Sequence, residues 1–127
     1  MPEPSIPDDV LRFIARYIDS AEQLDLLLLL HRDPERAWAS SAAAEAVYSV
    51  PASSERRLHA LAEQGLAERG AGGAYAYAPR DPELADTVER LAQAYRSNRA
   101  GVITAVFERQ TADPVRSFAD AFKFKRS

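Results

Sequence analysis

The chain has 127 residues, 46% of them hydrophobic and none of them cysteine, and its formal net charge at pH 7 is -3. This length suits one domain with its own core, and the lack of cysteine excludes a disulfide framework and a thiolate metal site. The longest aliphatic run, residues 26–30, is too short to span a membrane and the amino terminus is acidic, so we expect a cytoplasmic protein with no membrane partner.

Two helices are predicted in the first 35 residues. Asp8 and Asp9 follow a proline-rich start and favour a helix amino terminus, after which apolar residues recur at helical spacing up to Ile18. Residues 20–23 match a capping box that starts a second helix, whose leucines at 26–30 predict the central helix of the core. Eight acids and only three arginines lie in residues 1–35, which leaves open a protein partner for this acidic region.

Residues 38–78 predict a short helix, a turn, a second helix and a hairpin. Trp38 lies in a short extended link at 36–39 and is the expected core anchor. The helices should cover residues 41–48 and about 53–64 with a turn at 49–51. Gly65 stands where a left-handed residue usually ends a helix. Strands are expected at 66–69 and 74–78, joined by the glycine-rich tip 70–73.

The spacing L-x-x-L-x-x-x-G-L falls here on Leu58, Leu61, Gly65 and Leu66, between a preceding helix and turn and a glycine-tipped hairpin. With this spacing, residues 40–79 resemble the winged helix-turn-helix of bacterial transcriptional regulators, particularly MarR-like proteins. The resemblance is close over these residues and looser over most of the rest of the chain. It implies a cytoplasmic DNA-binding regulator that acts as a homodimer.

The outward face of the helix at 53–64 carries the candidate DNA contacts. A rotation of 100° per residue places Ser53, Arg56, Arg57, Ala60 and Gln64 on that side, where arginine can bridge the two acceptors of guanine and serine can bond phosphates. A solvated charged face is the alternative, and the neighbouring Glu55 and Glu63 favour it. The predicted DNA-binding residues are Ser53, Ser54, Arg56, Arg57, Gln64 and, at the base of the hairpin, Arg69.

A long helix is predicted over residues 82–110, with Asp81 as its N-cap and Pro82 in its first turn. One apolar strip follows a four-three spacing from Leu84, and a second lies near the carboxyl end. Because such a helix is longer than the domain it leaves, we expect dimerisation, whereas a helix that bends near Gly101 and packs back is the alternative. The predicted dimer interface is Leu91, Tyr95, Val102, Ile103, Val106 and Phe107.

The carboxyl end predicts a further short helix after Pro114 and a basic aromatic tail. Phe124 lies among Lys123, Lys125 and Arg126, so contact with phosphate or an acidic partner is one interpretation and a solvated terminus the other. No catalytic constellation is recognisable, since the serines lack an activating histidine and the two histidines lack metal-ligand spacing. We therefore expect no enzyme activity, no cofactor and no metal.

The expected fold class is mainly α with a small β-hairpin, namely a winged helix-turn-helix with a long C-terminal dimerisation helix. The winged helix-turn-helix domain should cover residues 1–80 and the C-terminal helical dimerisation extension residues 81–127, as one compact unit. The predicted function is a sequence-specific transcriptional regulator that binds double-stranded DNA as a homodimer. The alternative is a winged-helix protein–protein interaction module that does not bind DNA.

Overall fold

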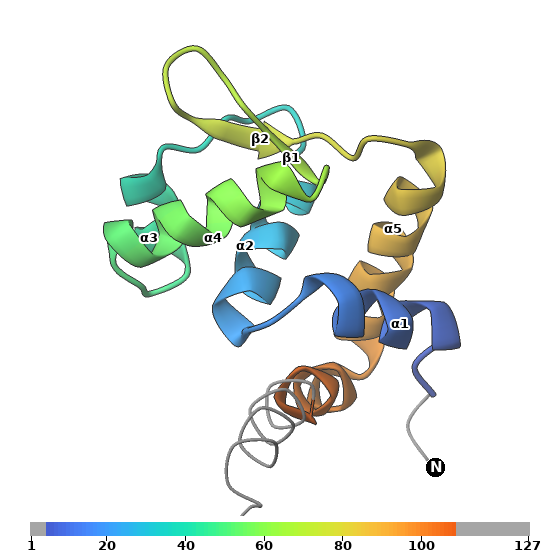
Figure 1. Ribbon diagram of the computed structural model, residues 1–127. Helices are drawn as coiled ribbons and strands as arrows, with labels where there is room; N and C mark the ends of the chain where they lie inside the picture. Colours follow the sequence, from blue (N-terminus) through green and yellow to red (C-terminus); the bar gives the residue numbers. More distant parts are fainter. Residues whose placement is uncertain (1–4, 109–127) are drawn as a thin grey trace, which may run out of the picture.

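A computed structural model describes residues 5–108 as a mainly helical chain with one small antiparallel sheet (Figure 1). The mainly helical class with a hairpin is therefore confirmed. The short helix after Pro114 and the basic tail at 123–126 lie outside the described residues. The elements are α1 (Asp8–Tyr17), α2 (Ala21–Arg32), α3 (Ser40–Ala46), α4 (Pro51–Glu63), β1 (Ala67–Arg69), β2 (Tyr75–Tyr77) and α5 (Pro82–Ser97), followed by helical residues 99–108.

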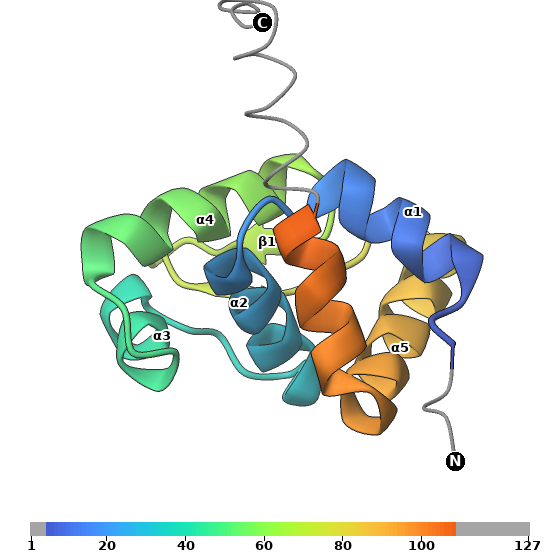
Figure 2. The ribbon, with the colours of Figure 1, turned by 90° about the horizontal axis from the view of Figure 1, so that it is seen from below.

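One apolar core joins these elements, and α2 lies at its centre (Figures 1 and 2). The second half of α2 is apolar on most sides because neighbours surround it, with α4, the hairpin and the carboxyl-terminal helices packed around it. The predicted core is confirmed, since each of its members is buried: Leu27, Trp38, Leu61, Leu66 and Tyr75.

The start of α2 is half of the predicted capping box. The Ser20 hydroxyl accepts a hydrogen bond from the Gln23 backbone N–H at 3.1 Å, as expected. The Gln23 side chain does not reach back to the serine. It is buried and donates instead to the Tyr17 carbonyl at 3.0 Å and to the Gln64 side chain at 3.2 Å, which ties α2 to the end of α4.

The two helices of the predicted helix-turn-helix are present with shifted ends. The first covers Ser40–Ala46, not 41–48, because Tyr48 takes a left-handed φ of 59° and closes the helix: its N–H bonds the Glu45 carbonyl, and that of Ser49 bonds the Ala44 carbonyl. The second begins at Pro51, two residues before the prediction, because the fixed φ of proline suits the first position of a helix.

The same closure ends α4, here with the expected glycine. Gly65 has a φ of 81°, and the Leu66 N–H bonds the Leu61 carbonyl at 2.9 Å. A methyl group on Gly65 would also meet the Arg80 side chain at 2.7 Å, so this position requires glycine for two reasons.

The predicted hairpin is present, but its strands cover Ala67–Arg69 and Tyr75–Tyr77, not 66–69 and 74–78. In it Ala67 lies opposite Tyr77 and Arg69 opposite Tyr75. A contact between the extended link before α3 and this hairpin was not predicted. Trp38 forms an isolated bridge with Tyr75, with N–O distances of 2.7 and 2.8 Å, so the link before α3 extends the small sheet by one residue. Because the bridge uses only the backbone of Trp38, its indole stays free to pack in the core.

The predicted single helix over 82–110 is wrong. The expected start is confirmed, since Asp81 accepts from the Leu84 N–H at 2.8 Å and Pro82 lies in the first turn. However, α5 ends at Ser97, and Asn98 leaves the helical conformation with φ -151° and ψ 66°. The Asn98 side chain then accepts from the Gly101 N–H at 3.0 Å, as the N-cap of a new helix does. The helical residues after Asn98 cross back over the core and do not extend away from it (Figure 2).

Candidate functional site

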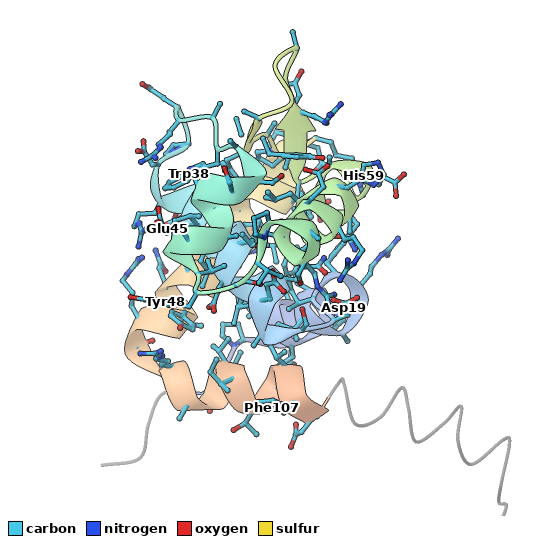
Figure 3. All side chains as sticks on the ribbon, turned by 90° about the vertical axis from the view of Figure 1, so that its left-hand side faces the viewer. Asp19, Trp38, Glu45, Tyr48, His59 and Phe107 are labelled. Carbon is cyan, nitrogen blue, oxygen red and sulfur yellow. The ribbon has the colours of Figure 1, made fainter. Side chains whose placement is uncertain are left out.

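The outward surface of α4 is a narrow ridge, which we call the α4 crest and define by Ala52, Arg56, His59 and Glu63. These four side chains are exposed, and they recur at helical spacing along one side of α4. His59 lies 3.8 Å from Glu63, one turn on, and projects from the outer edge of the molecule (Figure 3). Arg56 forms no ion pair within residues 5–108, so it is the cation that the crest offers to a partner.

Ser53 and Ser54 do not face outward, because the carboxylate of Glu22 holds both. The Ser53 hydroxyl donates to one carboxylate oxygen at 2.6 Å and the Ser54 hydroxyl to the other at 2.8 Å. Ser54 is fully buried, so its prediction as a DNA contact is wrong. Both hydroxyls join α4 to the first turn of α2.

Glu22 stays ionised in this position. Burial opposes its negative charge, but the hydrogen bonds from Ser53, Ser49 and Ser54 and the positive charge of Arg57 outweigh that effect and lower the pKa below the ordinary value of 4.5. An ionised acceptor makes stronger hydrogen bonds than a neutral one. The amino-terminal half of α4 is therefore fixed to α2 by charge-assisted bonds.

Arg57 is also turned away from the crest. Its guanidinium donates to Asp19 at 2.8 Å and lies 3.9 Å from Glu22, and its side chain is 31% exposed. Gln64 is likewise occupied, because its amide donates to the Tyr17 carbonyl at 3.3 Å and its oxygen accepts from Gln23. The angular prediction placed both residues outward, but each extends sideways to a neighbouring helix.

A second carboxylate, that of Glu55, holds the opposite flank of α4. It accepts hydrogen bonds from the Ser40 hydroxyl at the start of α3 and from the Tyr75 hydroxyl in the hairpin, the latter at 2.8 Å. These two bonds, Ser40 first, lower the pKa of Glu55. The pKa of the Tyr75 hydroxyl is raised, by burial first and then by its bond to this carboxylate. Thus Glu22 and Glu55 position α4 from its two sides, and the crest lies between them.

The charges around the crest are of mixed sign. Two arginines are exposed here, Arg56 on α4 and Arg69 at the base of the hairpin. Negative charge on or beside α4 comes from Asp19, Glu55 and Glu63. Phosphate attraction grows with the number of uncompensated cations. This surface therefore offers a few specific cations and no continuous basic patch within residues 5–108.

The predicted dimer interface is mostly inside the chain's own core. Leu91, Val102 and Val106 are at most 1% exposed, so their assignment to a partner is wrong. Leu91 packs inward from α5, whereas Val102 and Val106 do so from the helix after Asn98. Tyr95 and Ile103 are half-buried against that core. Of the six, Phe107 alone is largely free, at 55% exposed, and it points away from the other helices (Figure 3).

The part of the chain that the structure describes holds no group of three or more His, Asp or Glu side chains that could bind a metal ion. Within the same residues, no helix has both the length and the apolar character needed to cross a membrane. The chain matches no known protein family, no curated protein and no solved structure. Its function must therefore be argued from its own surfaces.

Proposed function

We propose that this chain is a winged-helix regulator that binds double-stranded DNA with α4 in the major groove. The observation that carries the proposal is the position of Arg56, exposed on the α4 crest, free of ion pairs within residues 5–108 and one turn after the small Ala52. A small neighbour allows the helix to approach base edges closely, and arginine can bridge the two acceptors of guanine. The order α2, α3, α4 and hairpin supports this reading, since it is that of a winged helix-turn-helix.

The rigid mounting of α4 gives the proposal further support. Base readout needs a side chain held in a defined place, and a helix fixed on both flanks satisfies this need better than a free one. The carboxylates of Glu22 and Glu55 provide that fixation without occupying Arg56. Arg69, exposed at the base of the hairpin, supplies a phosphate contact beside α4 in this proposal.

The proposal includes a homodimer, with a smaller candidate interface than the one predicted from the sequence. The exposed Phe107 and the half-buried Ile103 remain the candidates for a two-fold contact. In an isologous contact the same surface of both protomers meets, and a residue on the two-fold axis contacts its own copy. Each protomer would then present one α4 crest to the duplex.

The test is a binding titration on fragments of genomic DNA at several salt concentrations. Arg56→Ala should remove most of the sequence preference, about 1–3 kcal/mol at one base position, while the fold stays intact because the residue is exposed. Arg96→Ala, an equal loss of charge at an exposed position of α5, is the matched control and should bind like wild type. Absence of salt-dependent binding at low ionic strength, or wild-type behaviour of Arg56→Ala, would sink the proposal.

A second candidate function is a protein-interaction module, and one observation favours it. Tyr48 is 97% exposed and Val50 61% exposed at the turn between α3 and α4. Tyr48 lies on the side of the molecule away from His59 (Figure 3). Tyr48 also has a positive φ of 59°, which is unfavourable for a residue with a side chain. An aromatic residue in a position that glycine would satisfy suggests a role for its ring.

Duplex binding by the wild-type chain separates the two candidates, and Tyr48→Gly is the accompanying variant. It should stabilise the fold by roughly 1 kcal/mol, because glycine adopts the left-handed conformation without penalty. For the DNA regulator, binding to duplexes should be unchanged. For the interaction module, the wild-type chain should show no salt-dependent DNA binding at all.

A further inference from the structure

We propose that the cleft between α1 and the start of α5 binds a phosphoryl group. The two helices pack against each other (Figures 1 and 2), and the cleft between them has a volume of about 400 Å³. Three arginines line it together with one tyrosine hydroxyl: Arg12, Arg16, Arg80 and Tyr17. This site is separate from the α4 crest and goes beyond the proposed function.

Two of the three guanidiniums in this cleft are uncompensated. Arg12 and Arg16 lie one helical turn apart on α1, both are exposed, and neither forms an ion pair within residues 5–108. Arg16 lies beside the ring of Tyr17 at 5.5 Å from its centroid. Side chains four residues apart on a helix project in the same direction, so these two cations can contact one ligand.

Arg80 and Tyr17 add an oriented donor to the same cleft. One end of the Arg80 guanidinium donates to the Gln64 carbonyl at 2.6 Å, and the other end donates to the Tyr17 hydroxyl at 3.3 Å. Because the hydroxyl oxygen already accepts this bond, its own hydrogen is available to an incoming oxyanion. Guanidiniums from α1 and a hydroxyl from a different direction suit the tetrahedral oxygens of a phosphoryl group.

The carboxylates that line the cleft are mostly engaged. Asp9 forms an ion pair with Arg90 at 2.6 Å. Asp81 caps α5 through the Leu84 N–H and lies 3.7 Å from the Arg80 guanidinium. Glu83 alone among them forms no ion pair within the described part of the chain. The amino terminus of α5 adds a partial positive charge at this edge of the cleft. An anion therefore meets two free cations and one opposing carboxylate.

Inorganic pyrophosphate is the probe for a test in which one variant should weaken binding and another should strengthen it. Arginine Nε–H and backbone amide signals of the full chain are followed by NMR during the titration at low ionic strength. The signals of Arg12, Arg16, Glu83 and Leu84 should move together. The double variant Arg12→Gln with Arg16→Gln should weaken binding at least about tenfold, because two charge-assisted contacts are lost. Glu83→Gln should strengthen it severalfold, since one opposing charge is removed.

The matched control replaces Arg32 and Arg96 with glutamine. Both are exposed and neither lines the cleft, so this variant has the same net charge as the double variant and should bind pyrophosphate like wild type. Equal weakening by the control, signal changes outside the cleft, or no effect of Glu83→Gln would overturn the proposal. Acetate, a planar anion, should bind more weakly than pyrophosphate.

A duplex DNA titration identifies the source of the phosphoryl group. If the double variant also lowers DNA affinity for all sequences and reduces the salt slope, the cleft holds a phosphate of the DNA backbone. If pyrophosphate binding is lost but DNA affinity is unchanged, the ligand is a free phosphate ester. Failure of the proposed DNA binding can be distinguished from failure of the cleft proposal. Arg56→Ala should leave pyrophosphate binding intact, and a chain that binds no DNA can still bind pyrophosphate.

Discussion

Helix α4 and the segment 82–108 share one sequence pattern, an amphipathic repeat at helical spacing, but their polar and apolar sides are used differently. In α4 the apolar residues Leu58 and Leu61 pack inward as predicted, and the polar flanks are bonded to other elements. In the segment 82–108 the apolar residues also pack inward, although a partner molecule was expected for some of them. Periodicity therefore identifies which side of a helix is buried, but not whether the same chain or a partner molecule covers that side.

The largest effect is expected at Val106, which the sequence assigned to a partner and the structure places in the core at 1% exposed. Val106→Asp should destabilise the single chain by at least about 4 kcal/mol, because an unpaired carboxylate cannot be buried without large cost. Chemical denaturation with light scattering measures both stability and mass. A folded monomer with wild-type stability would restore the original dimer assignment.

Phe107→Asp is the natural control for that experiment. Phe107 is 55% exposed, so this substitution should leave the free energy of unfolding of the isolated chain nearly unchanged. If the chain is a dimer through this surface, the same substitution lowers the mass to that of a monomer at tens of micromolar protein. Adjacent residues would thus give opposite results on stability and assembly.

Leu61 tests the face of α4 that sequence and structure agree on. Leu61→Ala should cost roughly 2–5 kcal/mol, because Leu61 is fully buried and a smaller side chain leaves a cavity. Ala60→Gly is the comparison on the half-buried side, where only the helix propensity changes, by about 1 kcal/mol. Similar losses for the two variants would mean that the helix has a different rotation from the one described.

The sequence predicted what depends on neighbours along the chain. The N-cap residues Ser20 and Asp81, the left-handed Gly65 and the presence of the hairpin each depend on a few adjacent residues, and all of them are confirmed. The side-chain partners on α4 were not predictable in this way. Glu22 bonds Ser53 and Ser54 from more than thirty positions away, and nothing in the local pattern pairs these residues.

Two further features were not predicted from the sequence for a related reason. The α4 crest was expected to include Arg57, since a rotation of 100° per residue ignores how far a long side chain extends sideways to an acid such as Asp19. The cleft arginines Arg12, Arg16 and Arg80 come from two elements far apart in the sequence. A regular i, i+4 pair of arginines on α1 was the one local signal for that site.

A smaller effect on stability is expected at Glu22. It tests whether the polar flank of α4 stabilises the fold or is only solvated. Its pKa is lowered in the folded chain, so its contribution to stability is present above the ordinary carboxyl value of 4.5 and is lost as the pH falls through the folded pKa. Glu22→Gln should therefore cost about 1–3 kcal/mol at pH 7, where charge-assisted bonds to Ser53 and the buried Ser54 are weakened. At pH 3 the difference from wild type should be smaller than at pH 7, because the carboxyl group begins to be protonated as the pH falls.

Thermal or urea unfolding at both pH values gives this comparison directly. A difference that is equal at pH 7 and pH 3 would show that the ionised form of Glu22 contributes nothing. Glu63→Gln is the control, because Glu63 is exposed on the α4 crest and, within residues 5–108, forms an ion pair only with the exposed His59. That variant should differ little from wild type at either pH.

The smallest expected change in stability is at Asn98, where the two descriptions of the helix predict changes of opposite sign. If residues 82–110 were one helix, Asn98→Ala would stabilise the chain by roughly 0.5 kcal/mol, because alanine is the better helix former in a helix interior. The structure instead makes Asn98 the N-cap of the second helix, with its side-chain oxygen 3.0 Å from the Gly101 N–H. Its replacement by alanine should then destabilise the chain by about 0.5–2 kcal/mol.

Asn98→Asp is the matched variant for this position, because aspartate is as good an N-cap and its charge is favourable at a helix amino terminus. Near wild-type stability for aspartate with a loss for alanine would establish the cap. The space around Gly101 is consistent with this role, since a methyl group there would meet the Asn98 side-chain nitrogen at 2.5 Å. A gain in stability for Asn98→Ala would favour a continuous helix and reopen the extended dimer contact. A loss keeps Val102 and Val106 in the core of their own chain, because only the break at Asn98 turns them back toward α2.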